Sequence, residues 1–252
     1  MHNYQVGLLT TFLLGIFILV GAFIALLINK KEKIVDFSIG LAFGVIATLL
    51  VTDLLPETFE SFGLKHIYLF LLFSIAGFFL LKFLDTLVPA HHDHHRMTKK
   101  EANNNLAHIG IITTLALILH NIVEGIAVYS AALSDAHLGL LLAIGVGFHN
   151  IPLGMVIASS FYQSNVDNKR TFASIALVAL STFIGGLVMY IFKLTVVSEI
   201  LLGILLSLTI GMLVFIILDE LIPRIRNTHN RRISFLGIGI GVVILIISLF
   251  IG

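Results

Sequence analysis

The chain has 252 residues, of which 58% are hydrophobic and only 12% are charged. A soluble domain normally carries about 25% charged residues, so this composition excludes a soluble protein and predicts an exterior that faces lipid. The net charge of +1 gives no reason to expect a nucleic-acid partner, and the absence of cysteine excludes disulfides, thiolate metal sites and cysteine nucleophiles. Any metal must be held by histidine, carboxylate, amide or backbone oxygen.

Eight apolar segments are long enough to cross a bilayer, which takes about 20 residues at about 1.5 Å per residue. In chain order they are 6–28, 36–57, 66–88, 107–130, 137–161, 171–193, 198–222 and 232–251. Backbone groups in lipid must bond within their own segment, so we expect helices and an all-α membrane protein. The first segment is too long for the core of a signal peptide, and we expect it to be retained.

Basic residues gather in alternate connections between these segments. The connections after the first, third, fifth and seventh segments hold 12 of the 15 Lys and Arg residues. Short cytoplasmic loops carry an excess of these residues, so both termini are predicted to face outside. We expect one eight-helix domain over residues 1–252 in a cell membrane, either a plasma membrane or a bacterial inner membrane.

The second and seventh segments end in related acidic motifs. Asp53 and Glu57 close the second segment, and Asp219 and Glu220 precede Pro223 in the seventh. With the predicted orientation, the first motif faces outside and the second faces the cytoplasm, as an inverted repeat of helices 1–3 against helices 6–8 would give. These acids either collect cations at the entrance and exit or reflect ordinary polarity near helix ends.

The predicted cytoplasmic connection at about 89–106 is rich in histidine, with four histidines among residues 91–95. Such a tract is typical either of loose metal binding or of a solvated, disordered loop, and the sequence leaves both open. Its predicted side of the membrane suits a release-side or sensing role.

The fourth and fifth segments share one six-residue pattern, H-N-I-x-x-G, about halfway along their length. His120 and Glu124 are four residues apart, so they share a helical face with Cβ atoms about 5–6 Å apart. The two segments are antiparallel, so His149 should lie at the same depth. Ionisable groups inside a membrane are costly and mark functional sites, although interhelical hydrogen bonding is the competing interpretation. A His/Glu/His set with an open fourth position suits a cation that must be released.

Asn121 and Asn150 follow the two histidines directly. They point about 100° away from them around the helix and are candidate metal ligands on a second wall of the same cavity. Hydrogen-bonding contacts between helices are the alternative role. Pro152 should bend its helix and expose the carbonyl group four residues earlier.

These motifs, the eight spans and the histidine-bearing connection together resemble the ZIP family of divalent metal transporters, and its bacterial GufA-like branch in particular. The resemblance spans essentially the whole chain. It implies inward movement of Zn²⁺, or of Fe²⁺, Mn²⁺ or Cd²⁺, by motion of one helix bundle against another. His120, Glu124 and His149 match one of two adjacent metal sites in the family, and the transported ion is the only cofactor implied.

Two departures from the family bear on the second site. Leu153 stands where family members commonly have a glutamate that bridges two metals, and Gly185 aligns with another family glutamate. The second site would then keep only Asn121 and Asn150, which are neutral and compensate a divalent charge poorly. We therefore expect one principal metal with weaker binding and faster release.

The sequence thus predicts a secondary carrier whose partners are a divalent ion and the lipid bilayer, with no nucleic acid and with a homodimer left open. The departures also leave open a membrane sensor or scaffold that binds metal without moving it. An intramembrane zinc hydrolase is a third candidate, but the H-E-x-x-H motif that would supply its general base is absent, so no enzyme is expected.

Overall fold

The structure, a computed structural model, describes residues 3–28, 31–88, 99–164, 166–195, 197–228 and 230–251. Helices make up nearly all of these residues, and no strand occurs among them. Eight of the helical stretches are long and apolar enough to cross a membrane. This confirms the predicted all-α fold with eight spans. The histidine tract at 91–95 lies outside the described residues.

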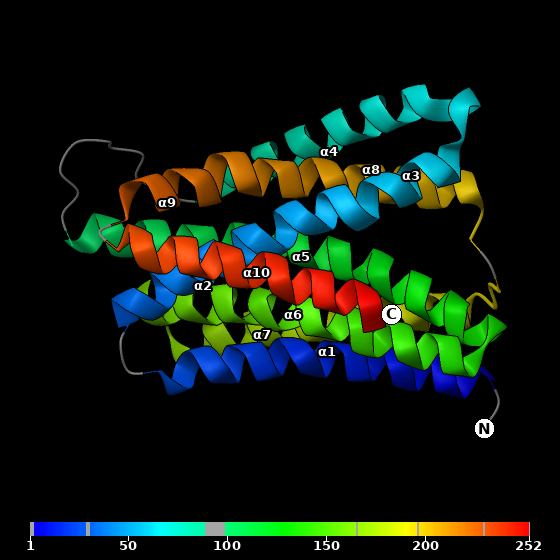
Figure 1. Cartoon of the computed structure of the whole chain (residues 1–252), viewed down its shortest axis with the longest axis horizontal. Coiled ribbons are helices and arrows are strands. Elements are labelled where there is room, and N and C mark those ends of the chain that lie inside the picture. Colours follow the sequence, from blue (N-terminus) through cyan, green and yellow to red (C-terminus); the bar gives the residue numbers. More distant parts are fainter. Residues whose placement is uncertain are drawn as a thin grey trace.

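The first four spans are formed by α1 (Asn3–Leu27), by α2 (Lys31–Leu49) with the turn η1 (Leu50–Leu54) and α3 (Leu55–Phe62), by α4 (Ile67–Leu87) after the short turn η2 (Leu64–His66), and by α5 (Lys99–Ser134). The last four are formed by α6 (Ala136–Ser164), by α7 (Asn168–Ile191), by α8 (Glu199–Phe215) with the turn η3 (Ile216–Leu221) and α9 (Ile222–Asn227), and by α10 (Arg231–Ile251). The start of α1 and the end of α10 lie toward the same end of the molecule (Figure 1).

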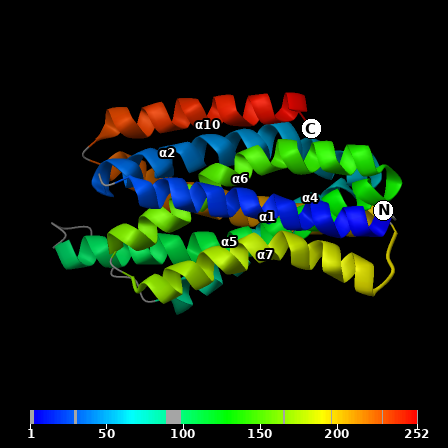
Figure 2. The same ribbon diagram turned by 90° about the horizontal axis from the view of Figure 1, so that it is seen from below.

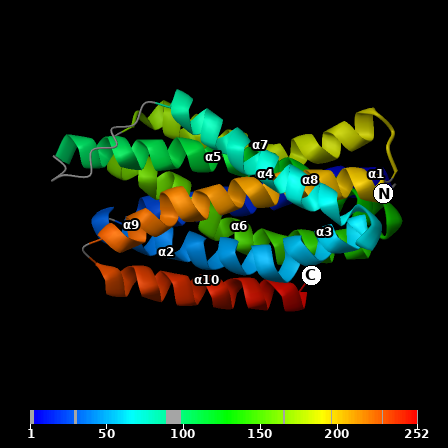
Figure 3. The same cartoon turned by 90° about the horizontal axis from the view of Figure 1, so that it is seen from above.

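The spans form two groups that pack mainly within themselves. One group, here called the site bundle, consists of α1, α5, α6 and α7. The other, here called the frame, consists of two helix pairs, α2 with α10 and α4 with α8, and α3 packs on α8. Figure 2 shows α10 and α2 side by side at one edge and α7 at the opposite edge, and Figure 3 shows α4 along α8. The groups meet where α6 contacts α2 and α10 and where α5 contacts α8.

Glycines allow the closest helix contacts inside each group. A Cβ on Gly125 of α5 would lie 1.9 Å from the carbonyl oxygen of Thr182 on α7, and a Cβ on Gly44 of α2 would lie 2.3 Å from that of Ile238 on α10. No side chain fits at such distances, so glycine is required for these helices to approach. Among the described residues, glycine contacts of this kind join helices of the same group, so each group is a more tightly packed unit than the interface between them.

Two spans contain a π-helical turn just before a proline. In the second span the turn η1 carries Asp53, and Pro56 opens α3; in the seventh span η3 carries Glu220, and Pro223 opens α9. Proline cannot donate to the carbonyl four residues earlier, and the N–H of the residue before it bonds to the carbonyl five residues back. Each span therefore continues past its proline, and the turn changes the direction of the acidic side chain.

The second span is longer than predicted. It continues to Phe62, so the predicted end at 57 was wrong because Pro56 lies in the first turn of α3, where no intrahelical donor is needed. The helix α5 begins at Lys99, so residues 99–106 of the predicted loop are helical, and residues 89–98 lie outside the described residues. Pro152 lies inside α6, which continues through it to Ser164.

Candidate metal centre

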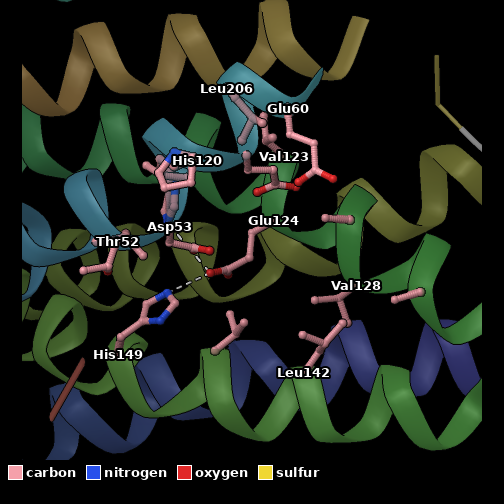
Figure 4. A pocket seen from close by; sticks show the side chains of 17 residues that line it. Thr52, Asp53, Glu60, His120, Val123, Glu124, Val128, Leu142, His149 and Leu206 are labelled. Carbon is pink, nitrogen blue, oxygen red and sulfur yellow. Dashed lines mark hydrogen bonds and ion pairs between the residues drawn. The ribbon is translucent and has the colours of Figure 1, made fainter. Parts of the chain in front are cut away.

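A cavity of about 490 Å³ lies between the site bundle and the frame. The site bundle contributes His120 and Glu124 from α5 and His149 from α6, and the frame contributes residues of η1, α3 and α8. Figure 4 shows the side chains of both groups turned toward this space. The cavity therefore brings the paired motifs of the fourth and fifth spans together at one place.

The two histidines and the glutamate converge on one point. The Nε2 atom of His149 lies 3.0 Å from Oε1 of Glu124, the Nε2 atom of His120 lies 3.8 Å from the same oxygen, and one ligand atom from each residue falls within 4.8 Å of the others. Tetrahedral zinc with bonds of about 2.0–2.1 Å places its ligand atoms about 3.3 Å apart. The observed separations lie on either side of that value, so small side-chain adjustments would let all three atoms bind one ion.

Burying these polar side chains costs free energy of folding unless their polar atoms have partners. His120 and His149 are 4% and 3% exposed, and Nε2 of His120 has no hydrogen-bond partner among the described residues. A buried polar nitrogen without a partner costs about 1–3 kcal/mol. A cation bound between the imidazoles and the carboxylate would remove that cost by using the free nitrogen lone pair.

The two asparagines of the paired motifs lie outside the cavity lining. Asn150 donates a hydrogen bond from Nδ2 to Oε2 of Glu124 at 3.0 Å, and Asn121 donates from Nδ2 to the carbonyl oxygen of Val178 on α7 at 3.1 Å. Both side chains are fully buried. The sequence pattern presents the amides as equivalent, whereas the structure gives them different contacts.

Asp53 belongs to the central cavity and not only to its entrance. It lies on the π-turn η1, and Figure 4 shows its carboxyl group beside that of Glu124, with both imidazoles turned toward the same space. From its sequence this residue was expected at a helix end, but the span continues to Phe62, so Asp53 lies farther inside it. With Asp53, two carboxylates face the cavity centre, which removes the expected shortage of negative charge.

Two further acids continue from Asp53 toward the end of α3. Glu57 and Glu60 line the same cavity; Glu57 follows Asp53 by four residues, and Glu60 follows Glu57 by three. These spacings place the three carboxylates along one face of the helix. The cavity therefore has an acidic mouth, at the end of the molecule where α1 begins (Figure 1).

A second group of histidine and carboxylates lies toward the other end of the spans. Nε2 of His108 on α5 is 2.6 Å from Oδ1 of Asp85 on α4 and 3.3 Å from Oε1 of Glu220 on η3. His108 is 4% exposed, and the three residues also offer ligand atoms within 4.8 Å of one another. This group joins the site bundle to the frame. No sequence pattern points to Asp85 or His108, because neither is part of a recognisable motif.

The positions of the two departures from the family are closely packed. Leu153 is 1% exposed within the main apolar core, four residues from His149 on the same face of α6. At Gly185 on α7, a Cβ would lie 2.2 Å from the carbonyl oxygen of Ile122 on α5. A longer side chain at 185 would therefore force α5 and α7 apart.

Comparison with known proteins gives a consistent result. The sequence model of a family described as ZIP zinc transporter matches residues 89–249. A zinc transporter ZupT of Oceanobacillus iheyensis is 30% identical over 266 residues, covering 100% of this chain and 99% of that protein. Proteins of the same name from Clostridium perfringens and Chlorobium luteolum are 30% and 31% identical, each covering 100% of this chain and 97% and 99% of their own length.

Proposed function

Because this chain belongs to the ZIP family of zinc transporters, we propose that it is a secondary transporter that carries a divalent cation, Zn²⁺ before Fe²⁺, Mn²⁺ or Cd²⁺, into the cytosol. Family membership and the eight spans make it a multi-pass protein of the cell membrane and not an enzyme. The proposal rests above all on one observation, the convergence of two imidazoles and a carboxylate in a cavity at the middle of the spans.

The central residues are proposed to bind the ion while it is carried. His120 and His149 supply one nitrogen each and Glu124 supplies one oxygen, which leaves at least one position for water or for Asp53. An incompletely closed ligand set suits a carrier, since a closed four-ligand site would release zinc too slowly. The nitrogen and carboxylate ligands also suit zinc better than calcium or magnesium, which prefer oxygen alone.

The acidic groups define a path on either side of this site. Asp53, Glu57 and Glu60 would collect cations at the mouth, because a cleft lined with one sign of charge raises the local concentration of counter-ions. Asp85, His108 and Glu220 would close the other end and lie where the ion leaves. With the orientation predicted from the basic loops, the mouth faces outside.

Movement between two states is proposed to occur at the interface of the site bundle and the frame. The three central ligands all belong to the site bundle, and the glycine contacts hold that bundle together as a unit. Motion of this bundle against the frame would therefore carry the ion with its ligands. It would also separate His108 from Asp85 and Glu220, which would open the closed end.

Uptake of radioactive zinc by vesicles containing the purified protein tests the proposal. Replacing Glu124 or His120 with alanine should reduce uptake to the level of empty vesicles, because the ion loses a ligand in a site of low dielectric constant. His137→Ala is the matched control, since His137 is exposed near the start of α6 and should leave uptake unchanged. Normal uptake in both site variants would refute the proposal. Stoichiometric zinc binding without uptake in the wild type would favour a sensor.

A further inference from the structure

The two asparagines that follow the site histidines occupy matching sequence positions but do different things. Asn150 donates its amide to Oε2 of Glu124, and Asn121 donates its amide to a backbone carbonyl of α7. We infer that Asn150 is a positioning residue that aims Glu124 at a single ion, and that Asn121 ties α5 to α7 without reaching the ion. This inference rests on the proposed function and concerns the same site.

The contacts of Glu124 divide its two oxygens between two tasks. Oε2 accepts the hydrogen bond from Asn150 at 3.0 Å, whereas Oε1 faces Nε2 of both histidines at 3.0 and 3.8 Å. The amide N–H restrains rotation of the carboxylate, and it occupies one of the two lone pairs of Oε2. Glu124 therefore directs Oε1 to an ion held between the histidines, and Asn150 acts in this contact through its Nδ2 donor, which cannot be a ligand, while its neutral Oδ1 has no hydrogen-bond partner among the described residues.

The asparagine side of Glu124, away from the cavity, is poorly suited to a second ion. Nδ2 of Asn121 is used by the carbonyl of Val178, so this residue offers only its neutral Oδ1, which has no hydrogen-bond partner among the described residues, and Leu153 is 1% exposed in the apolar core. The backbone of Ile122 occupies the space where a side chain at Gly185 would begin. A divalent ion in a site of low dielectric constant needs negative charge close to it, and among the described residues Glu124 is the one carboxylate in the group of ligand atoms that converges here. The centre thus holds one ion.

The experiment uses the full-length protein in detergent with Co²⁺ as the probe. Metal analysis gives the number of ions per chain, and the visible absorption of bound Co²⁺ reports its coordination number and geometry. The wild type should bind one Co²⁺ per chain. Asn150→Ala should still bind one ion, but with a changed visible spectrum and about 10- to 100-fold weaker affinity, as is usual when the partner of a metal ligand is removed.

Asn121→Ala is the matched control, because Asn121 has the same residue type, the same burial and the same place in the repeated motif. Its Co²⁺ spectrum should equal that of the wild type, and its affinity should stay within about twofold, well below the range expected when a ligand's partner is removed. If Asn150→Ala does not purify as a folded protein, Asn150→Ser takes its place. The serine hydroxyl keeps a polar group but is too short to reach Glu124, so the same spectral change is expected.

Several results would overturn the inference. Two Co²⁺ ions per wild-type chain would refute the single-ion centre. An unchanged spectrum in the Asn150 variants, or an equal change in Asn121→Ala, would refute the positioning role. His149→Ala separates these failures from failure of the proposed function. If His149→Ala abolishes binding while the Asn150 variants behave as wild type, only the positioning role is wrong; if His149→Ala binds Co²⁺ as the wild type does, the proposed central site is wrong and the inference with it.

Discussion

Removing the imidazole of His108 should open the end of the transporter that lies opposite the acidic mouth. His108 contacts Asp85 at 2.6 Å and Glu220 at 3.3 Å, and Glu220 is 8% exposed. In His108→Ala the two carboxylates would face each other without a cationic partner while this end is closed, and would be hydrated once it opens. Removing one partner of a buried ion pair costs about 3–5 kcal/mol, and about 3 kcal/mol corresponds to a shift of roughly a hundredfold toward the open state.

A single cysteine can report that shift, because the chain contains no other thiol. Ser160 is fully buried on α6 and follows His149 by 11 residues, so it lies within about 20° of the same helical face and about 16 Å along the helix from His149, toward the closed end. In Ser160→Cys the thiol should react slowly with N-ethylmaleimide. Adding His108→Ala should speed that reaction by about a hundredfold, since the rate follows the population of the open state.

Ser181→Cys controls for general loosening of the protein. Ser181 is also fully buried, but it lies on α7 inside the site bundle, where it donates a hydrogen bond to the carbonyl oxygen of Val178 at 2.6 Å. Its thiol should remain slow with or without His108→Ala. Equal acceleration at both positions would mean that the variant is merely destabilised. An unchanged rate at Ser160→Cys would show that His108 does not hold this end closed.

Three further substitutions test charge along the path. Glu124→Gln keeps the shape of the side chain but removes its charge, so zinc affinity measured by equilibrium dialysis should fall at least about a hundredfold; retained affinity would exclude Glu124 as a ligand. Glu60→Gln at the mouth should raise the KM of zinc uptake a few-fold at low salt with kcat unchanged, and a deficit that persists at high salt would argue against electrostatic collection. Leu153→Glu adds a carboxylate one turn from His149, so zinc should bind about tenfold tighter and be taken up more slowly at saturation, with weaker binding as the contrary result.

Much of the fold could be predicted from hydrophobic segment length alone. Eight apolar stretches gave eight spans, because lipid forces each stretch to satisfy its backbone internally. The errors lie where local chemistry outweighs composition. Pro56 appeared to end the second span, but it lies in the first turn of a new helix, and the polar residues after Lys99 form the start of α5 in spite of their low hydropathy.

The candidate site was only partly readable from the sequence. His120, Glu124 and His149 could be grouped because spacing within a helix and a repeated motif fix their depth and face. Asp53 and His108 could not be placed, because their positions depend on how the site bundle packs against the frame, and no local pattern records that packing. The two asparagines show the same limit, since an offset of about 100° does not say which neighbouring helix a side chain will meet.

The π-helical turns also determine how the frame is built. At η1 the second span stops packing on α10 and begins packing on α8, and at η3 the seventh span, which packs on α4, continues into α9 beside α2. The second and seventh spans thus each pass from one helix pair of the frame to the other, so the two pairs are connected by continuous backbone. The two pairs would therefore stay joined through the chain itself even where the side-chain packing between them is loosened.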